Sequence, residues 1–432
     1  MENMLVTKRV KNYNVLIYLF LFLFFIQPFV PVISSYVGGP IISGLRDTIV
    51  IILIMAIAFA ISIKKDIKLK KFDIFLIVYI MYGLCHVFIA LTDLQVAIDK
   101  FRLVFLYPIL SLLLIIYLRN ISVKKINKDL VVNLFIFQGV VVLIFSILEF
   151  VFQDKLLHFL YRENFQYIRN DLLGQTGIRL VSTLYNPINL GIFLNLFLVF
   201  LLYKKEKINV FGFSSRILRV LLIFLTIIIT LLTYSRISYL IVVGTFILFV
   251  LFNSRKILSI RTISLIIFLL LILPIGGFFL GENIDNLNKR FSQISIEHFK
   301  ENDRIDNWKT YLKEMSSIGE MYLIWGGGLG TSNSDTKSQD VYVKRVENSY
   351  VSFLGELGTI GLIMFAVILG KMFINLISLL KTNSTDSKIF LQLLFVLMIA
   401  ALTNDVFQNN PFSFYFWCMF TYSEIIILDR RK

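Results

Sequence analysis

The chain has few of the residues from which disulfide frameworks and metal sites are built. Its two cysteines, Cys85 and Cys418, both lie within apolar segments, so no disulfide framework is indicated. Its three histidines, His86, His158 and His298, show no spacing typical of metal ligands. The sequence therefore predicts neither a disulfide-stabilised fold nor a metal centre.

A cleavable signal peptide and a nucleic-acid partner are also not indicated. Basic residues at 8–11 precede an apolar run, but the run continues to about Ile33 without a small-residue cleavage site, which predicts an uncleaved first helix. The formal net charge is +15. Membrane proteins concentrate Lys and Arg in cytoplasmic loops. This excess therefore needs no nucleic acid to explain it, and none is expected as a partner.

Apolar residues, in contrast, are in excess. They make up 57% of the 432 residues, above the roughly 45–50% of soluble domains. A membrane-spanning helix needs about 20 mostly apolar residues. The segments that qualify are roughly 15–34, 43–63, 72–92, 101–118, 130–152, 180–203, 217–234, 237–253, 260–281, 349–378, 388–404 and 412–428. The sequence predicts an all-α polytopic bundle of about twelve spans, with residues 1–432 forming a single membrane domain.

Basic residues are densest in the short segments on one side of these spans. The stretch 64–71 contains five lysines, whereas the other side owes most of its basic residues to two long loops, 153–179 and 282–348. Because short cytoplasmic loops are enriched in Lys and Arg, both termini are predicted to be cytoplasmic. The two long loops are then predicted to face outward.

The 282–348 loop is a polar island in an otherwise apolar chain, and its central part has a helical pattern. Apolar residues recur at helical spacing and predict a helix over 303–318 that lies on the membrane surface or over a cavity mouth. These residues are Ile305, Trp308, Tyr311, Leu312 and Met315. Such a helix is either a structural lid or part of a functional site, and the pattern alone leaves both open.

The same loop contains the glycine-rich run Gly326-Gly327-Gly328-Leu329-Gly330. No strand is expected before it and no Lys-Ser/Thr pair directly follows its last glycine, so it lacks the features of a nucleotide-binding loop. We expect a flexible turn that returns the chain to the membrane.

Several arginines fall on the predicted outer side, against the usual bias. The guanidinium group offers a planar fork of donors that suits phosphate and carboxylate oxygens, which favours an anionic lipid headgroup as ligand. Snorkelling or a salt bridge to an acid of the island is the alternative explanation. These arginines are Arg179, Arg236, Arg290, Arg304 and Arg345.

Two further polar groups interrupt apolar segments. Asn186, Pro187 and Asn189 lie within the predicted span 180–203, where we expect Pro187 to break the helix ladder and its neighbours to face a cavity. A simple kink is the alternative. Glu347 precedes a span and is a candidate general base for a sugar hydroxyl, or else an acid favoured by the helix dipole. Glu356 is a second acid, deeper in that span.

In this order, these motifs resemble the O-antigen polymerase and O-antigen ligase superfamily of bacterial surface-polysaccharide enzymes, over about residues 175–370. Four parts carry the resemblance. They are Arg179-Leu180 followed by Tyr185-Asn186-Pro187-Ile188-Asn189, then Thr233-Tyr234-Ser235-Arg236, then Arg304 with Trp308 before the glycine-rich run, and finally Glu347-Asn348 separated by nine residues from Gly358-Thr359-Ile360-Gly361.

The resemblance implies an inverting glycosyl transfer, without metal or other cofactor, on the outer face of the bacterial cytoplasmic membrane. The expected donor is an undecaprenyl-pyrophosphate-linked oligosaccharide, and the expected partners include membrane lipid, a chain-length regulator and a flippase. The candidate catalytic residues are Glu347 and Arg304, and the candidate substrate-binding residues are Arg179, Arg236, Arg290, Asn186, Asn189, Asn348 and Trp308. The resemblance assigns the pyrophosphate to Arg179, Arg236 and Arg304.

One departure separates the branches of this superfamily. The ligase branch shares these motifs but carries His at the position of Glu347. The glutamate in this chain therefore favours a polymerase, with a ligase as the alternative. A flippase would be expected to show internal repeats and midplane charges. A polyprenyl-phosphate glycosyltransferase would need an acid in the first outer loop, and 34–40 has none. Septal peptidoglycan polymerases have fewer spans.

Several aromatic residues near the predicted outer side are candidates for a sugar-stacking groove. An interfacial aromatic belt is the alternative reading of the same residues. They are Tyr161, Tyr167, Trp308, Tyr311 and Tyr322.

Overall fold

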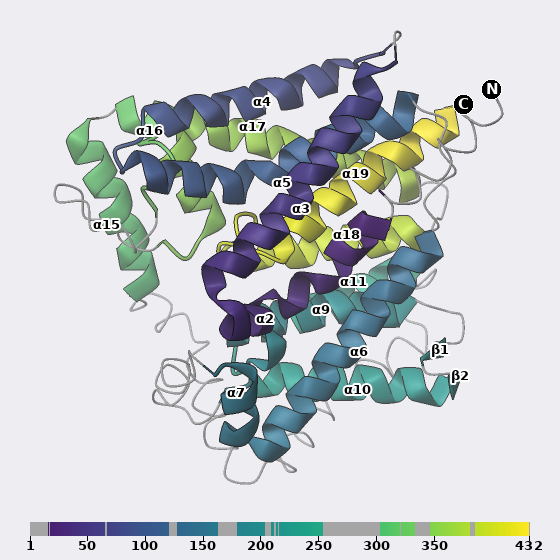
Figure 1. Ribbon diagram of the computed structural model, residues 1–432. Coiled ribbons are helices and arrows are strands. Elements are labelled where there is room, and N and C mark those ends of the chain that lie inside the picture. Colours follow the sequence, from purple (N-terminus) through teal and green to yellow (C-terminus); the bar gives the residue numbers. More distant parts are fainter. Residues whose placement is uncertain are drawn as a thin grey trace.

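The protein is a bundle of helices in a computed structural model (Figure 1). The structure describes residues 16, 18–64, 67–120, 128–162, 179–203, 209–210, 213–214, 216–253, 303–319, 321–332, 346–380 and 385–431. The predicted span 260–281, Tyr167, Arg290, His298 and Arg345 lie outside these residues. Within them, the only strands are β1 (Asn209–Val210) and β2 (Phe213–Ser214), which form one short antiparallel pair.

Seven of the described helices are long and apolar enough to cross a membrane. They are Tyr18–Val37, which includes η1 (Gln27–Phe29) and α2 (Val30–Val37); α3 (Gly39–Ser62); α4 (Lys71–Phe88); α5 (Leu94–Asn120); α6 (Lys128–Phe152); α11 (Arg236–Asn253); and α17 (Ser349–Leu380). Two shorter apolar helices are α9 (Pro187–Tyr203) and α10 (Arg216–Leu232). The remaining helical elements are α7 (Asp154–Leu160), η2 (Ser182–Leu184), α15 (Asp303–Ile318), α16 (Met321–Trp325), α18 (Thr385–Ala400) and α19 (Phe412–Arg431).

The prediction of an all-α membrane bundle is confirmed. The structure does not establish the count of twelve spans, although each predicted span other than 260–281 coincides with a helix. The predicted span 180–203 is wrong at its start, because the helix begins only at Pro187. Helices α10 and α11 form a tight hairpin, since α10 ends at Leu232 and α11 begins at Arg236.

The centre of the bundle is α9, whose residues from Leu190 to Leu201 are all buried. It packs against α6, α10, α11 and α18. A helix that is apolar on every side is stable only when other helices surround it. The core of the protein therefore lies around α9.

Helices α15 and α16 lie at one end of the bundle, on the left in Figure 1, and we call this end the rim. The loop 89–93 between α4 and α5, the hairpin tip 233–235 and the starts of α9, α17 and α19 are at the rim. The α10–α11 hairpin has its other end near β1 and β2, on the right in Figure 1. The rim gathers three of the four sequence motifs and part of the remaining one.

Helix α17 has a kink at Gly358, where the backbone adopts φ 69° and ψ −177°. The glycine-rich run crosses this kink, because a Cβ at Gly358 would lie 2.2 Å from the carbonyl oxygen of Ile324 and 2.5 Å from the nitrogen of Gly326. Only glycine permits both this backbone conformation and this approach. The kink thus fixes the position of the run against the membrane helix.

Candidate functional site

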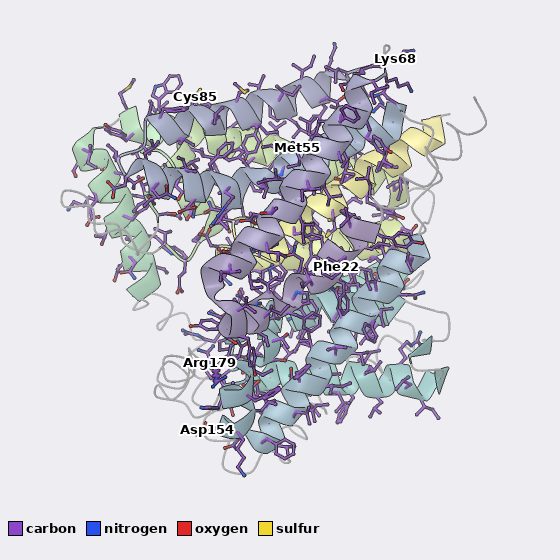
Figure 2. All side chains as sticks on the ribbon, in the orientation of Figure 1. Phe22, Met55, Lys68, Cys85, Asp154 and Arg179 are labelled. Carbon is purple, nitrogen blue, oxygen red and sulfur yellow. The ribbon has the colours of Figure 1, made fainter. Side chains whose placement is uncertain are left out.

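Arg179 lies at the tip of the α10–α11 hairpin. Its Nε donates a hydrogen bond of 3.1 Å to the carbonyl oxygen of Thr233, and the nitrogen of Leu180 donates to the oxygen of Leu232 at 3.3 Å. Arg236 starts α11 three residues after Thr233. The first two sequence motifs therefore meet at the rim, and Figure 2 shows Arg179 there, at the end of the bundle away from Lys68 of the basic 64–71 segment.

The Asn186 side chain bonds to the backbone at the start of α9. Its Oδ1 accepts a hydrogen bond of 2.8 Å from the nitrogen of Ile188 and one of 3.4 Å from that of Asn189, which makes it the cap of α9. Pro187 does not break the helix, because it occupies the first helical position, where no intrahelical donor is needed. The Asn-Pro pair thus starts the central helix at the rim.

Asn189 connects this helix start to the fourth motif. Its Oδ1 accepts a hydrogen bond of 2.8 Å from Nδ2 of Asn404, and the carbonyl oxygen of Asn404 accepts one of 3.0 Å from Oγ of Ser349. Ser349 is the first residue of α17 and lies two positions after Glu347. Two motifs separated by about 160 residues of sequence are therefore joined through one asparagine.

Asn348 caps α17. Its Oδ1 accepts from the nitrogens of Tyr350 (2.9 Å) and Val351 (3.1 Å), and its Nδ2 donates 3.0 Å to the oxygen of Leu402. Glu347 precedes this cap and is partly exposed at the rim. The contacts of Asn348 thus fix the first turn of α17 directly after Glu347.

The glycine-rich run is not the flexible turn that we expected. Residues 326–332 are all buried, and the nitrogens of Gly327 and Gly328 donate to the oxygens of Gly355 (2.8 Å) and Glu356 (3.0 Å). The kink in α17 leaves these carbonyl groups available to partners outside the helix. The run therefore docks on the membrane helix as an integral part of the rim.

A buried charge cluster, formed by Lys100, Glu356 and Asp405, lies beneath this run. Lys100 Nζ is 3.3 Å from Oε1 of Glu356 and 3.7 Å from Oδ2 of Asp405. The Glu356 side chain is fully buried, and its Oε1 also accepts from the nitrogen of Gly330 (3.2 Å) and from Oγ of Ser332 (2.6 Å). Glu356 is therefore held by several donors in the protein interior. The Asp405 side chain is 15% exposed.

The 401–411 loop joins these groups, and the sequence analysis did not single out any of its residues. Gln408 Nε2 donates 3.4 Å to Oε2 of Glu356, while Asp405 pairs with Lys100. Its run of Asn, Asp and Gln between two apolar helices is the signal that could have identified it. Its partners were not identifiable, because Lys100 lies some 300 residues away in the chain.

Helix α15 has the predicted extent but is docked on protein. Tyr311 and Met315 are buried together with Val346, and Trp308 packs against this cluster. The Tyr311 hydroxyl lies 3.2 Å from Oγ1 of Thr331, and burial raises the pKa of Tyr311 above its ordinary value. The stripe thus fixes α15 to the start of α17 and to the glycine-rich run.

Two of the aromatic residues considered for a sugar groove are core residues instead. Tyr161 is completely buried, donates 2.6 Å to the oxygen of Ser182 and accepts 2.9 Å from the nitrogen of Tyr185. Tyr311 is buried as described above. A stacking platform needs an exposed ring face, so neither residue serves as one.

The third motif is only partly described. Arg304 belongs to the first turn of α15, but its side chain lies outside the described part of the protein, as do Arg290 and Arg345. Of the candidate site residues, the structure describes Arg179 and Arg236 at the hairpin tip and Glu347 before α17, together with Asn186, Asn189 and Asn348 at the starts of α9 and α17. Two guanidinium groups near one helix tip and a carboxylate on a neighbouring helix start are suited to binding an anion and accepting a proton.

Residues 221–366 match the family model described as O-antigen ligase. The matched segment includes Arg236, Arg304, Trp308 and Glu347, whereas Arg179 precedes it. No curated protein matches the chain. The match supports the superfamily that the motifs predicted. Together with the apolar helices, it indicates a multi-pass protein of the inner membrane.

Proposed function

We propose that this chain, a member of the O-antigen ligase and polymerase superfamily, is a polysaccharide polymerase. It joins oligosaccharide repeat units that are carried on undecaprenyl pyrophosphate, at the outer face of the cytoplasmic membrane. In this proposal the rim faces outward and both termini are cytoplasmic. The short 64–71 segment supports this orientation because its lysines belong to the opposite end of the bundle.

The observation that carries the proposal is the hydrogen bond from Arg179 to Thr233. It places one guanidinium group at the hairpin tip from which Arg236 begins the next helix. A pyrophosphate has oxygens enough to accept donors from both side chains, and fork-shaped guanidinium donors match its geometry. Arg304 and Arg290 are further donors in this proposal.

The chemistry is a single displacement at the anomeric carbon of the donor sugar. The acceptor hydroxyl oxygen forms the new glycosidic bond while the bond from carbon to the pyrophosphate oxygen breaks, which inverts the configuration. The arginines stabilise the charge that develops on the leaving pyrophosphate. Glu347 accepts the proton of the acceptor hydroxyl.

The framework around Glu347 supports this role. Asn348 caps the helix that follows it, and Ser349 bonds to Asn404. Val346, on its other side, is buried against α15. The backbone of Glu347 is thus anchored on both sides, and a general base needs such a fixed position to accept a proton within hydrogen-bond reach.

A ligase is the second candidate, because the matching family model is described as O-antigen ligase. Glu347 in place of the ligase histidine is the reason to prefer the polymerase. The two activities share a donor and differ in the acceptor, which is another repeat unit for a polymerase and a different molecule for a ligase.

Purified protein in vesicles, supplied with pyrophosphate-linked repeat units, tests the proposal. A ladder of lipid-linked products is the expected result. Transfer of sugar only to a separate acceptor would identify a ligase. Passage of intact donor across the bilayer without new glycosidic bonds would identify a flippase and contradict the polymerase assignment.

A further inference from the structure

Helix α16, which belongs to the polar island, has an exposed apolar face. Met321, Ile324 and Trp325 are spaced by three and four residues, so they share one face of the helix. They are 63%, 47% and 48% exposed, and Ile318 at the end of α15 is 45% exposed. We call these four residues the α16 patch. An exposed apolar patch in a polar segment marks an interaction surface.

The membrane helix α4, which contacts α16, has an exposed apolar stripe of its own. Its residues recur at alternating intervals of four and three positions, as one face of a helix requires. They are Ile74, Val78, Met81, Cys85 and Phe88. Figure 2 shows Cys85 at the end of α4 away from Lys68, and Figure 1 shows α16 at that same end. In a protein of the inner membrane, such a stripe faces the acyl chains of lipid.

Helix α17, the other neighbour of α16, presents a similar stripe. Ile363, Val367 and Ile374 are 57%, 44% and 65% exposed. Thr359, one turn before Ile363, is itself exposed and contacts α16. The α16 patch therefore adjoins two helix faces that are directed at lipid.

Hydrogen bonds from these membrane helices satisfy the backbone at the end of α16. The Tyr82 hydroxyl donates 3.2 Å to the carbonyl oxygen of Trp325, and Oγ1 of Thr359 donates 2.8 Å to that of Leu323. The nitrogen of Gly326 donates 2.8 Å to the oxygen of Tyr322. Three of the last four carbonyl groups of α16 thus have partners within the protein. Water would satisfy them in an aqueous loop, whereas lipid cannot.

The same bonds place the end of α16 below the end of α4. Tyr82 and His86 both face the carbonyl oxygen of Trp325. At 1.5 Å per residue they lie about 16–23 Å along α4 from Lys71. The hydrocarbon core is about 30 Å thick, and the basic 64–71 segment marks its cytoplasmic edge. The end of α16 therefore lies at the depth of the outer half of the hydrocarbon core.

We propose that α16 is inserted in the outer leaflet of the membrane and that the α16 patch contacts phospholipid acyl chains. The polar island is thereby anchored in the bilayer directly before the glycine-rich run. Only the choice of leaflet rests on the orientation given with the proposed function. Insertion itself rests on the exposed apolar side chains and on the bonds that satisfy the α16 backbone.

Tryptophan fluorescence of the full-length protein in phosphatidylcholine vesicles tests the insertion. The chain has three tryptophans, so the double variant Trp308→Phe/Trp417→Phe leaves Trp325 as the single fluorophore. Vesicles whose lipid is dibrominated in the middle of the acyl chain are expected to lower its emission at least about twofold, because the indole ring touches lipid. Iodide in the aqueous phase is expected to have little effect.

The matched control moves the single tryptophan to the polar face of α15. In that variant Trp325→Phe is combined with Lys309→Trp, since the Lys309 side chain is 75% exposed. Its emission is expected to respond to iodide and not to brominated lipid. Quenching of Trp325 by iodide to the same extent as this control would mean that α16 lies in water, and would overturn the proposal.

Quenching of Trp325 by neither reagent would also overturn it, because another protein surface, such as a second copy of the chain, would then cover the patch. Met321→Cys provides a second measurement in case the tryptophan variants do not accumulate. In a Cys85→Ser/Cys418→Ser background it is expected to react with a water-soluble maleimide at least about tenfold more slowly than Lys309→Cys, because lipid disfavours the reactive thiolate. Equal rates would contradict insertion. Neither measurement involves a glycan or a donor lipid, so both stand apart from the test of the proposed function.

Discussion

Lys100 and Glu356 form an ion pair of 3.3 Å in which neither side chain is more than 3% exposed. Lys100 comes from the start of α5 and Glu356 from the kinked region of α17. Asp405 contacts the same ammonium group at 3.7 Å. A single cation thus pairs with two carboxylates beneath the glycine-rich run. We therefore expect removal of the lysine to affect stability differently from removal of either acid.

Lys100→Met is predicted to destabilise the protein by about 3–5 kcal/mol, because it leaves the buried Glu356 and the partly exposed Asp405 without their cation. Glu356→Gln is predicted to cost less, since Lys100 keeps Asp405 as a partner. The double variant should be more stable than the sum of the single effects predicts. Thermal unfolding in detergent measures all three.

The control for the lysine is Lys309→Met on α15. Lys309 is 75% exposed and pairs with Asp306 at 3.7 Å, and exposed ion pairs contribute only about 0–1 kcal/mol. Two outcomes would contradict a stabilising role of the buried charge cluster. One is additive stability changes in the Lys100→Met/Glu356→Gln double variant, and the other is an equal loss of stability in Lys100→Met and Lys309→Met.

Gly358→Ala is predicted to cause a large loss of folded protein, because its Cβ would meet the Ile324 carbonyl at 2.2 Å and its φ is 69°. Gly370→Ala is the matched control in the same helix, where nothing lies within 4 Å of the added carbon. It should be neutral or stabilise the helix by up to about 1 kcal/mol. Yield of monodisperse protein and unfolding temperature distinguish them, and equal behaviour would refute the proposed docking.

Arg236→Ala is predicted to abolish polymer formation while protein levels are maintained. Arg236→Lys is predicted to reduce it by roughly tenfold or more, because lysine keeps the charge but loses the planar fork of donors. Arg219→Lys, at the other end of α10–α11, is the matched control and should leave the rate unchanged. Normal polymer from Arg236→Ala would remove this residue from the site.

Glu347→Gln is predicted to lower the rate by about 10²–10⁴-fold, the usual contribution of a general base. The amide keeps the shape of the side chain, so the affinity for donor lipid should stay near that of the wild type. Glu314→Gln on α15 is the comparison. Wild-type turnover by Glu347→Gln would show that the proton goes elsewhere.

Asn348→Ala is predicted to lower stability by about 1 kcal/mol through loss of the helix cap. Asn348→Ser keeps a capping oxygen but loses the bond from Nδ2 to Leu402, so it should be intermediate in stability. If Asn348 positions Glu347, both variants reduce the rate of polymer formation, and Asn348→Ala reduces it more than Asn348→Ser. Calorimetry or light-scattering melts measure the stability of the variants, and turnover of donor lipid measures their rates.

The sequence predicted much of the frame. The apolar runs located the helices because a span needs a continuous stretch of apolar residues. The spacing of Trp308, Tyr311 and Met315 predicted α15 because helical periodicity is a local property. The start of α9 was misplaced, because Leu180, Val181 and Leu184 extend the apolar run before it, whereas the helix begins at the Asn186-Pro187 pair.

The site could be predicted only in part. The arginines and Glu347 stand out as charges near the ends of apolar segments. The capping bonds of Asn186 and Asn348 were not predicted, and their assignment to substrate stays a prediction. A side chain caps a helix only if the backbone after it is helical, and composition alone does not predict where that helix starts.

By itself, the sequence determined the fold class, the membrane location and the superfamily, because hydrophobic length and ordered motifs are read along the chain. Only the tertiary structure decided which groups meet. The pairing of Lys100 with Glu356, the bond between Asn189 and Asn404, and the docking of the glycine-rich run on α17 all join distant segments. Such contacts arise when helices pack and exclude water from polar groups, which must then find partners wherever the fold brings them.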